Sequence, residues 1–142
     1  DAAQNQNAVV AIGSRALDRS LIGVHQSAFR EASGVVFNRV MRICTGLPFA
    51  DTQCGFKFFR HRLAKAVFAM QEIDGYMYDV EIIALALRMG AKLEQIPIRW
   101  RDDADSRLDL VSGNIQNLKD ILRIRRRMAS IRPEEFQLSS QE

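Results

Sequence analysis

The chain has 142 residues, of which 47% are hydrophobic and 26% charged, a composition typical of one compact globular domain. Its formal net charge of +3 is too small to indicate a nucleic-acid-binding protein. Two cysteines are too few for a disulfide scaffold or a zinc ribbon, so we expect both to be reduced. No apolar run approaches the roughly 18 residues that a membrane-spanning helix needs.

The first half of the chain predicts a strand followed by a long helix. Residues 8–14 (AVVAIGS) are almost all apolar, which is typical of a strand buried on both faces. Residues 27–45 have helical periodicity, and Gly46 and Pro48 end the helix. Its apolar stripe consists of Phe29, Ala32, Val36, Val40, Ile43 and Cys44, and Arg30, Arg39 and Arg42 lie off this stripe.

The second half continues with shorter elements. Residues 51–59 predict a loop that enters a short strand, and residues 61–70 a brief helix. A helix follows over residues 79–89, with Asp79 as its N-cap and Gly90 as the residue after its C-cap. Residues 93–100 predict a strand, and Pro97 indicates either that this strand lies at an edge of the sheet or that one ladder hydrogen bond is missing.

A last helix is expected over residues 112–128, with Ile115, Leu118 and Leu122 on one stripe, and residues 130–142 read as a polar C-terminal tail. The order of elements indicates an α/β fold with about three strands. This is too few for a complete doubly wound sheet, so we expect an incomplete sheet. Either an N-terminal half is missing from this sequence, or an assembly covers the open strand edge, through which the chain can self-associate.

The richest stretch for chemistry is the connection from Asp51 to Lys57 (DTQCGFK), which places an acid, an amide, a thiol and a cation within seven residues. Asp51 is suited to act as a general base or to orient one, and Lys57 to meet a phosphate. In the structural alternative, Asp51 and Thr52 cap a turn and Lys57 is solvated.

Two further groups of charged residues are candidates for a functional site. Asp79 and Glu81 lie at a predicted helix start, where acids are stabilised by the helix dipole, although a catalytic carboxylate is also common there. The acids of residues 102–105 are weak evidence for a metal site, whereas Arg107 is suited to clamp a phosphate with its fork of donors.

Arginines also crowd the end of the last helix, at positions 123, 125, 126, 127 and 132. Cations are favourable at a helix C-terminus, so this clustering has a structural explanation. Contact with anionic lipid head groups is the functional alternative. RNA contact is disfavoured because no aromatic residues alternate with these arginines.

Together these segments resemble the C-terminal half of family 2 glycosyltransferases of the dolichyl-phosphate glucosyltransferase and polyprenyl-phosphate mannosyltransferase type. The resemblance covers about residues 8–127. It is most specific in the string DTQCGFK of residues 51–57, and it also includes residues 10–15, 34–42, 45–48, 75–81 and 97–107.

The resemblance implies the C-terminal part of a GT-A fold, in residues 1–129, with a mixed sheet flanked by helices. It implies inverting transfer of glucose or mannose from UDP-glucose or GDP-mannose to a polyprenyl phosphate. Asp51 and Asp79 would be catalytic, and Gln53, Lys57, Glu81 and Arg107 would bind the acceptor phosphate. The helix that carries Arg30, Arg39 and Arg42 would lie against the cytosolic face of a membrane, or else it packs in the core.

The family's metal and diphosphate ligands belong to an N-terminal half that this sequence does not contain. We therefore expect Mg²⁺ or Mn²⁺ only in a complete enzyme, no metal site in this half, and no transferase activity from this chain alone. The alternative is a non-catalytic module that binds a lipid phosphate or a protein partner. Nucleic acid is not expected as a partner.

Overall fold

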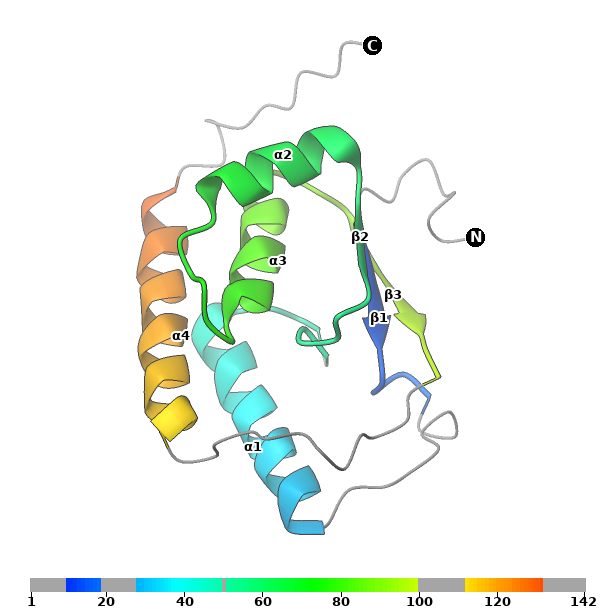
Figure 1. Cartoon of the computed structure of the whole chain (residues 1–142), viewed down its shortest axis with the longest axis vertical. Helices are drawn as coiled ribbons and strands as arrows, with labels where there is room; N and C mark the ends of the chain where they lie inside the picture. Colours follow the sequence, from blue (N-terminus) through cyan, green and yellow to red (C-terminus); the bar gives the residue numbers. More distant parts are fainter. Residues whose placement is uncertain (1–9, 19–27, 50, 100–111, 132–142) are drawn as a thin grey trace.

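The computed structural model describes residues 10–18, 28–49, 51–99 and 112–131, and these residues form a small α/β fold (Figure 1). The strands are β1 (Val10–Ser14), β2 (Lys57–Phe59) and β3 (Leu93–Pro97). The helices are α1 (Ala28–Thr45), α2 (His61–Met70), α3 (Tyr78–Arg88) and α4 (Ser112–Ser130). The predicted order of elements and the predicted number of strands are therefore confirmed for the described part of the chain.

The sheet is mixed, with the strand order β2-β1-β3. β1 runs antiparallel to β2, with Val10 opposite Phe59, and parallel to β3, with Val10 opposite Leu93. All five residues of β1 are buried, as its apolar sequence predicts for a central strand. Pro97 lies at the end of the edge strand β3, where its missing N–H removes no essential ladder bond.

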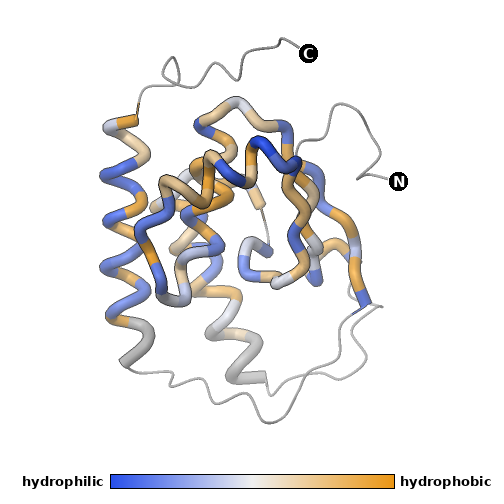
Figure 2. The backbone as a smooth tube through the Cα atoms, turned by 45° about the horizontal axis from the view of Figure 1, so that its top comes forward, coloured by the Kyte–Doolittle hydropathy of each residue, from blue (hydrophilic) through white to orange (hydrophobic). Residues whose placement is uncertain are grey.

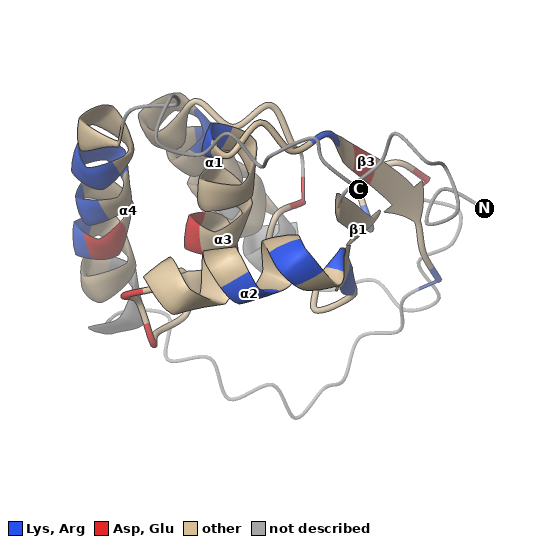
Figure 3. Ribbon diagram, turned by 90° about the horizontal axis from the view of Figure 1, so that it is seen from above, with Lys and Arg blue, Asp and Glu red and all other residues tan. Residues whose placement is uncertain are grey.

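The four helices lie to one side of the sheet, and α3 is at their centre (Figures 1 and 3). Every residue of α3 from Asp79 to Ala86 is buried, because α3 packs against both α2 and α4. A helix buried on all sides is the interior element of a fold. Figure 2 shows the contrast with α4, on which hydrophilic and hydrophobic residues alternate.

Two glycines end helices as predicted. Gly46 has a φ of 72° directly after α1, and Gly90 has a φ of 78° shortly after α3. This left-handed conformation is favourable for glycine because it has no Cβ atom. The prediction of Asp79 as the N-cap is wrong, because α3 begins at Tyr78 with Met77 as its N-cap. Asp79 lies in the first turn of the helix instead.

The predicted apolar stripes of α1 and α4 face outward. Val36 is 63% exposed and Ile43 74%, whereas Met41 is buried and is the one buried residue among the α1 side chains that the structure describes. On α4, Ile115 and Leu118 are exposed, and the buried positions within residues 115–130 are Asp120, Ile121, Ile124 and Met128. Val36, Val40 and Ile43 therefore do not pack in the core, which excludes that alternative for these three residues of the α1 stripe.

Two further findings concern the described residues as a whole. Among them, no helix combines the length and the apolar composition that a membrane crossing requires. Cys44 and Cys54 are both free thiols, as expected from their small number.

Candidate functional site

The first component of the candidate site is an ion pair at the C-terminal end of β1. Arg15 follows this strand directly, and its Nε lies 2.7 Å from Oδ2 of Asp51. The Nη2 atom of Arg15 donates to Oδ1 at 2.8 Å, and its backbone N–H donates to Oδ2 at 3.0 Å. The guanidinium therefore binds the carboxylate in a bidentate manner, which fixes the orientation of both side chains.

These contacts set the protonation state of Asp51. Burial alone would raise the pKa of its carboxyl, but the hydrogen bonds from Arg15, with the charges of Arg15 and Lys57, outweigh burial and lower the pKa below its ordinary value. The hydrogen bond with Asp51 in turn raises the pKa of Arg15 against the opposing effect of burial. Both groups are thus ionised near neutral pH.

The second component is a buried ion pair between β2 and the start of α3. Nζ of Lys57 lies 2.7 Å from Oδ1 of Asp79, and the two side chains are only 6% and 10% exposed. The Lys57 ammonium also donates a hydrogen bond to the carbonyl oxygen of Cys54. Lys57 is therefore held inside the protein, which excludes the alternative that it is a solvated surface residue.

The two ion pairs belong to one electrostatic site. The charge of Lys57 contributes to the lowered pKa of Asp51, so the second pair lies within reach of the first. We call Arg15, Asp51, Lys57 and Asp79 the charged quartet. Lys57 of the Asp51–Lys57 connection thus contacts Asp79 in the first turn of α3.

Tyrosines flank the charged quartet on the side of the loop that enters α3. The charge of Asp79, partial burial and a hydrogen bond to Asp79 raise the pKa of Tyr78. Tyr76 contributes to the electrostatic environment of Arg15, and both tyrosines are exposed. Two solvent-exposed tyrosine side chains therefore lie beside the charged quartet.

Two polar residues of the same connection complete the description of this region. Thr52 is fully buried, and its Oγ1 has no hydrogen-bond partner among the described residues. Gln53, predicted to bind the acceptor phosphate, is half-buried within the connection that separates Asp51 from Lys57. Its role stays a prediction.

Glu81, grouped with Asp79 in the sequence, does not join the quartet. It is 1% exposed, and its Oε2 accepts the backbone N–H groups of Glu72 at 3.0 Å and Ile73 at 2.9 Å. Its Oε1 is bound by Arg127 of α4. Residues two apart on a helix point to different sides, so Asp79 and Glu81 contact different parts of the protein. Glu81 anchors the loop before α3 and links α3 to α4.

Sequence reasoning did not select Arg15 as a site residue. The signal was nevertheless present, because a cation directly after an apolar strand lies at the carboxyl end of that strand, where α/β proteins commonly bind ligands. The pairing of Arg15 with Asp51, across 36 residues, had no local signal and required the structure.

The predicted membrane-interface arginines lie on α1. Arg39 and Arg42 are exposed, and Nη2 of Arg42 donates to the carbonyl oxygen of Pro48 at 3.4 Å. Arg30 belongs to α1, but its side chain lies outside the described part, and so does the whole of Arg107. The polar tail over 130–142 also lies outside it, apart from its first two residues.

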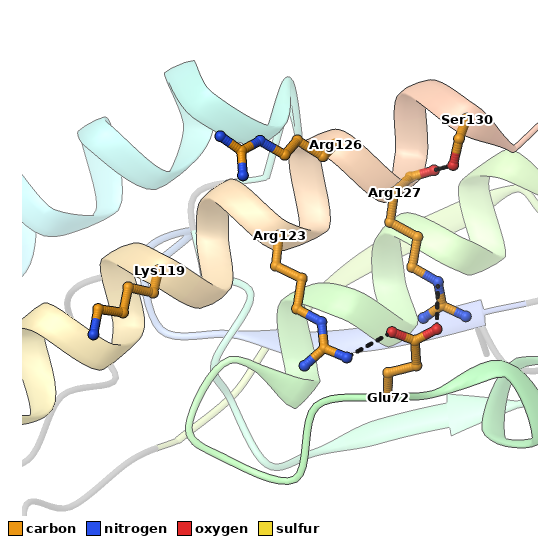
Figure 4. A pocket seen from close by; sticks show the side chains of 6 residues that line it. All are labelled: Glu72, Lys119, Arg123, Arg126, Arg127 and Ser130. Carbon is orange, nitrogen blue, oxygen red and sulfur yellow. Dashed lines mark hydrogen bonds and ion pairs between the residues drawn. The ribbon is translucent and has the colours of Figure 1, made fainter.

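A cleft with a cavity of about 410 Å³ lies elsewhere, between α4 and the loop after α2 (Figure 4). It shares no residue with the charged quartet. Its lining consists of Glu72, Lys119, Arg123, Arg126, Arg127 and Ser130. We call this the basic cleft.

A divalent metal does not fit the described residues. No group of three His, Cys, Asp or Glu side chains is positioned to share an ion among them. Asp51 and Asp79 are each already paired with a cation, so neither offers a free carboxylate to a metal.

Comparison with known proteins identifies a set of related enzymes. The chain is 34% identical to the dolichyl-phosphate beta-glucosyltransferase of Saccharomyces cerevisiae over 117 residues, which are 82% of this chain and 35% of that protein. It is 32% identical to the human dolichyl-phosphate beta-glucosyltransferase over 124 residues, or 87% of this chain and 38% of that protein.

A further relative of the same name, from Dictyostelium discoideum, is 40% identical over 75 residues, or 53% of this chain and 23% of that protein. No protein-family model and no solved structure matches the chain. The chain belongs to the glycosyltransferase family of the dolichyl-phosphate beta-glucosyltransferases, and it spans a little over a third of the length of the Saccharomyces and human relatives.

Proposed function

We propose that this chain is the acceptor-side part of an inverting glycosyltransferase with a GT-A fold, which transfers glucose from a nucleotide-sugar to a polyprenyl phosphate of the dolichyl type. The names of the relatives favour glucose, and hence UDP-glucose, over mannose from GDP-mannose. The observation that carries the proposal is the charged quartet, which gathers two cations and two carboxylates at the carboxyl end of β1 and the start of α3.

In this proposal Arg15, the more exposed cation, receives the acceptor phosphate, Lys57 adds positive charge from inside the protein, and the carboxylates position both cations. A phosphate oxygen is already ionised near neutral pH, so its attack on the anomeric carbon needs positioning and charge compensation more than a strong base. The lowered pKa of Asp51 supports this division of roles, because a carboxylate with a low pKa is a weak proton acceptor.

The individual roles follow from the geometry of the pairs. Asp51 holds the Arg15 guanidinium, and Asp79 holds the Lys57 ammonium, so that both cations stay at fixed positions when the phosphate arrives. Gln53 and Arg107 are proposed as further contacts to the phosphate. Mg²⁺ or Mn²⁺ is proposed to be held by parts of the complete enzyme outside this chain.

A membrane surface is the proposed location of the acceptor, at the cytosolic face. The exposed faces of α1 and α4 support this proposal, because their described exposed residues include aliphatic side chains and arginines but no acid. Apolar residues that enter the head-group region, flanked by cations, are typical of a helix that lies in the membrane interface.

The test is a chimera in which this chain replaces the matching third of the Saccharomyces cerevisiae relative. We expect UDP-glucose-dependent transfer to dolichyl phosphate, and a loss of about a hundredfold in kcat for Lys57→Met, since it removes a cation next to the developing charge. The matched control is Asp74→Asn, which changes one exposed charge in the loop before α3. We expect the isolated chain to transfer no sugar.

A second measurement guards against a chimera that fails to fold. The 142-residue chain is titrated with a short-chain polyprenyl phosphate, and its backbone amide signals are followed by NMR. The proposal expects saturable shifts near the charged quartet that disappear in Lys57→Met. Binding that survives Lys57→Met unchanged would contradict it. Lipid-phosphate binding together with a folded but inactive chimera would favour the non-catalytic module instead.

A further inference from the structure

The basic cleft contains an arrangement of cations that the charged quartet does not require. Lys119, Arg123, Arg126, Arg127 and Ser130 follow the spacing i, i+4, i+7, i+8 and i+11, so they share one side of α4. Four cations therefore line a cavity of about 410 Å³, with Glu72 as the single acid. This volume is large enough for a phosphate or diphosphate group.

Glu72 binds only part of this positive charge. Its Oε2 lies 2.8 Å from Nη2 of Arg123, and its Oε1 lies 3.4 Å from Nε of Arg127. Figure 4 shows both arginines directed toward Glu72, whereas the side chains of Lys119 and Arg126 extend away from it. Neither Lys119 nor Arg126 has an ion-pair partner within the described ranges.

The helix dipole does not explain the whole arrangement. It favours cations only in the last turn of a helix, and α4 extends over Ser112–Ser130, so Lys119 and Arg123 lie in its interior. Like charges four residues apart destabilise a helix, and this applies to Lys119 with Arg123 and to Arg123 with Arg127. A stripe that opposes the stability of its own helix indicates a function that requires it.

Arg127 occupies a special place in the basic cleft. Its side chain is only 17% exposed. Its guanidinium donates hydrogen bonds to the Glu81 carboxylate and to the carbonyl oxygen of Met70, which fix its position in the lining of the cleft. Arg123 is 56% exposed, and its one ion-pair partner among the described residues is Glu72. An incoming anion can therefore take Arg123 from Glu72 while Arg127 keeps its position.

We propose that the basic cleft is an anion-binding site for a phosphate group, separate from the charged quartet. The ligand chemistry is that of a phosphomonoester or diphosphate, and it is shared by a lipid head group and by a free phosphate compound. Arg126 and Lys119 provide the uncompensated charge, Arg123 moves from Glu72 to the ligand, and Glu72 acts as an internal competitor.

The experiment titrates the 142-residue chain with inorganic pyrophosphate by calorimetry and follows the arginine Nε–H signals by NMR. Arg126→Gln is expected to weaken binding about tenfold, the loss typical of one charge-assisted hydrogen bond. Arg125→Gln is the matched control, because Arg125 is the adjacent exposed arginine of α4 and does not line the cleft. It is expected to change the affinity less than twofold.

A second pair of variants tests the role of Glu72. Glu72→Gln is expected to strengthen pyrophosphate binding about fivefold, because it frees Arg123 for the ligand. Asp74→Asn removes an equal charge from an exposed residue outside the cleft and is expected to have less than a twofold effect. Equal effects of the two variants would mean that only the overall charge matters, which would overturn the proposal.

Parallel titrations use two kinds of vesicle, one of phosphatidylcholine alone and one of phosphatidylcholine with about 30% phosphatidic acid. Comparing them with pyrophosphate shows whether the phosphate belongs to a lipid head group or to a free phosphate compound. Binding of either pyrophosphate or acidic vesicles that depends on Arg126 but not on Arg125 supports the site and identifies its source. Binding that is lost equally in both variants is diffuse attraction and contradicts it, as does no binding at all. Because no readout involves sugar transfer or Lys57, failure here leaves the proposed glycosyltransferase function untouched.

Discussion

The two ion pairs of the charged quartet differ in their exposure to water. The Arg15 side chain is 33% exposed, whereas Lys57 and Asp79 are almost enclosed. Enclosed ion pairs contribute little net stability because removing two charges from water offsets their attraction, and apolar residues often replace them without loss. Their presence is therefore better explained by a need for fixed charges than by a need for stability.

The lowered pKa of Asp51 makes stability depend on pH in a defined direction. A carboxyl whose pKa is lower in the folded state stabilises the protein above its unfolded pKa of about 4, and this contribution disappears as the pH falls through the folded value. We expect Asp51→Asn to lower the free energy of unfolding at pH 7 by about 2 kcal/mol. Urea unfolding between pH 2.5 and pH 7 measures both effects, with these pH limits set roughly by the Asp titration range.

Comparing Asp51→Asn with a control variant separates the contribution of ionised Asp51 to stability from a general loss of stability in acid. The difference between wild type and Asp51→Asn should shrink as the pH falls below about 4, because protonation removes the same charge that the substitution removes. Asp74→Asn is the control, since its exposed side chain should show little difference at any pH. A difference for Asp51→Asn that is constant over the whole range contradicts the assignment.

At the scale of residues, the sequence indicates site residues that are neighbours along the chain, but not pairs that are far apart in the sequence. The string DTQCGFK indicated the importance of Asp51 and Lys57, because its chemistry is concentrated in seven neighbouring residues. The partners Arg15 and Asp79 lie far from it in the sequence, and their pairing depends on how β1, β2 and α3 pack. Helical periodicity alone, however, would have separated Glu81 from Asp79.

At the scale of elements, α1 and α4 show the limit of periodicity as a guide. The spacing of apolar residues predicted both helices correctly, but the predicted stripes face outward. Each helix carries apolar residues on two sides, with Met41 inside and Ile43 outside on α1. A periodic pattern indicates that a face is apolar, and it does not say what covers that face.

This difference between the two faces of α1 can be measured directly. Met41→Ala should lower the free energy of unfolding by about 2–5 kcal/mol, because it opens a cavity in the core. Ile43→Ala, which removes a similar apolar side chain that is 74% exposed, should change it by less than about 0.5 kcal/mol. Chemical denaturation of both variants provides the test, and a large loss for Ile43→Ala would show that this face is covered.

At the scale of the whole molecule, the sequence predicted the strands better than their arrangement. The apolar run over 8–14 indicated a central strand, and Pro97 indicated an edge strand, and both predictions are confirmed. The placement of β2 on the other side of β1, antiparallel to it, depends on contacts across more than forty residues. No local pattern encodes such contacts, so only the structure defines the order β2-β1-β3.

We expect the edges of this sheet to allow self-association. Within the described residues, β2 and β3 each pair on one side only, and next to the β2 edge Phe56 and Phe58 are 48% and 55% exposed with their rings 5.3 Å apart. An unpaired edge beside exposed aromatic side chains is a typical site for strand pairing between molecules. Sedimentation equilibrium should therefore reveal a concentration-dependent dimer, and Phe58→Ser should weaken it about fivefold through the loss of buried apolar area. Ile115→Ser, which removes an exposed apolar side chain from α4, is the control and should leave the dimer intact. A chain that stays monomeric at high concentration would show that these edges do not pair.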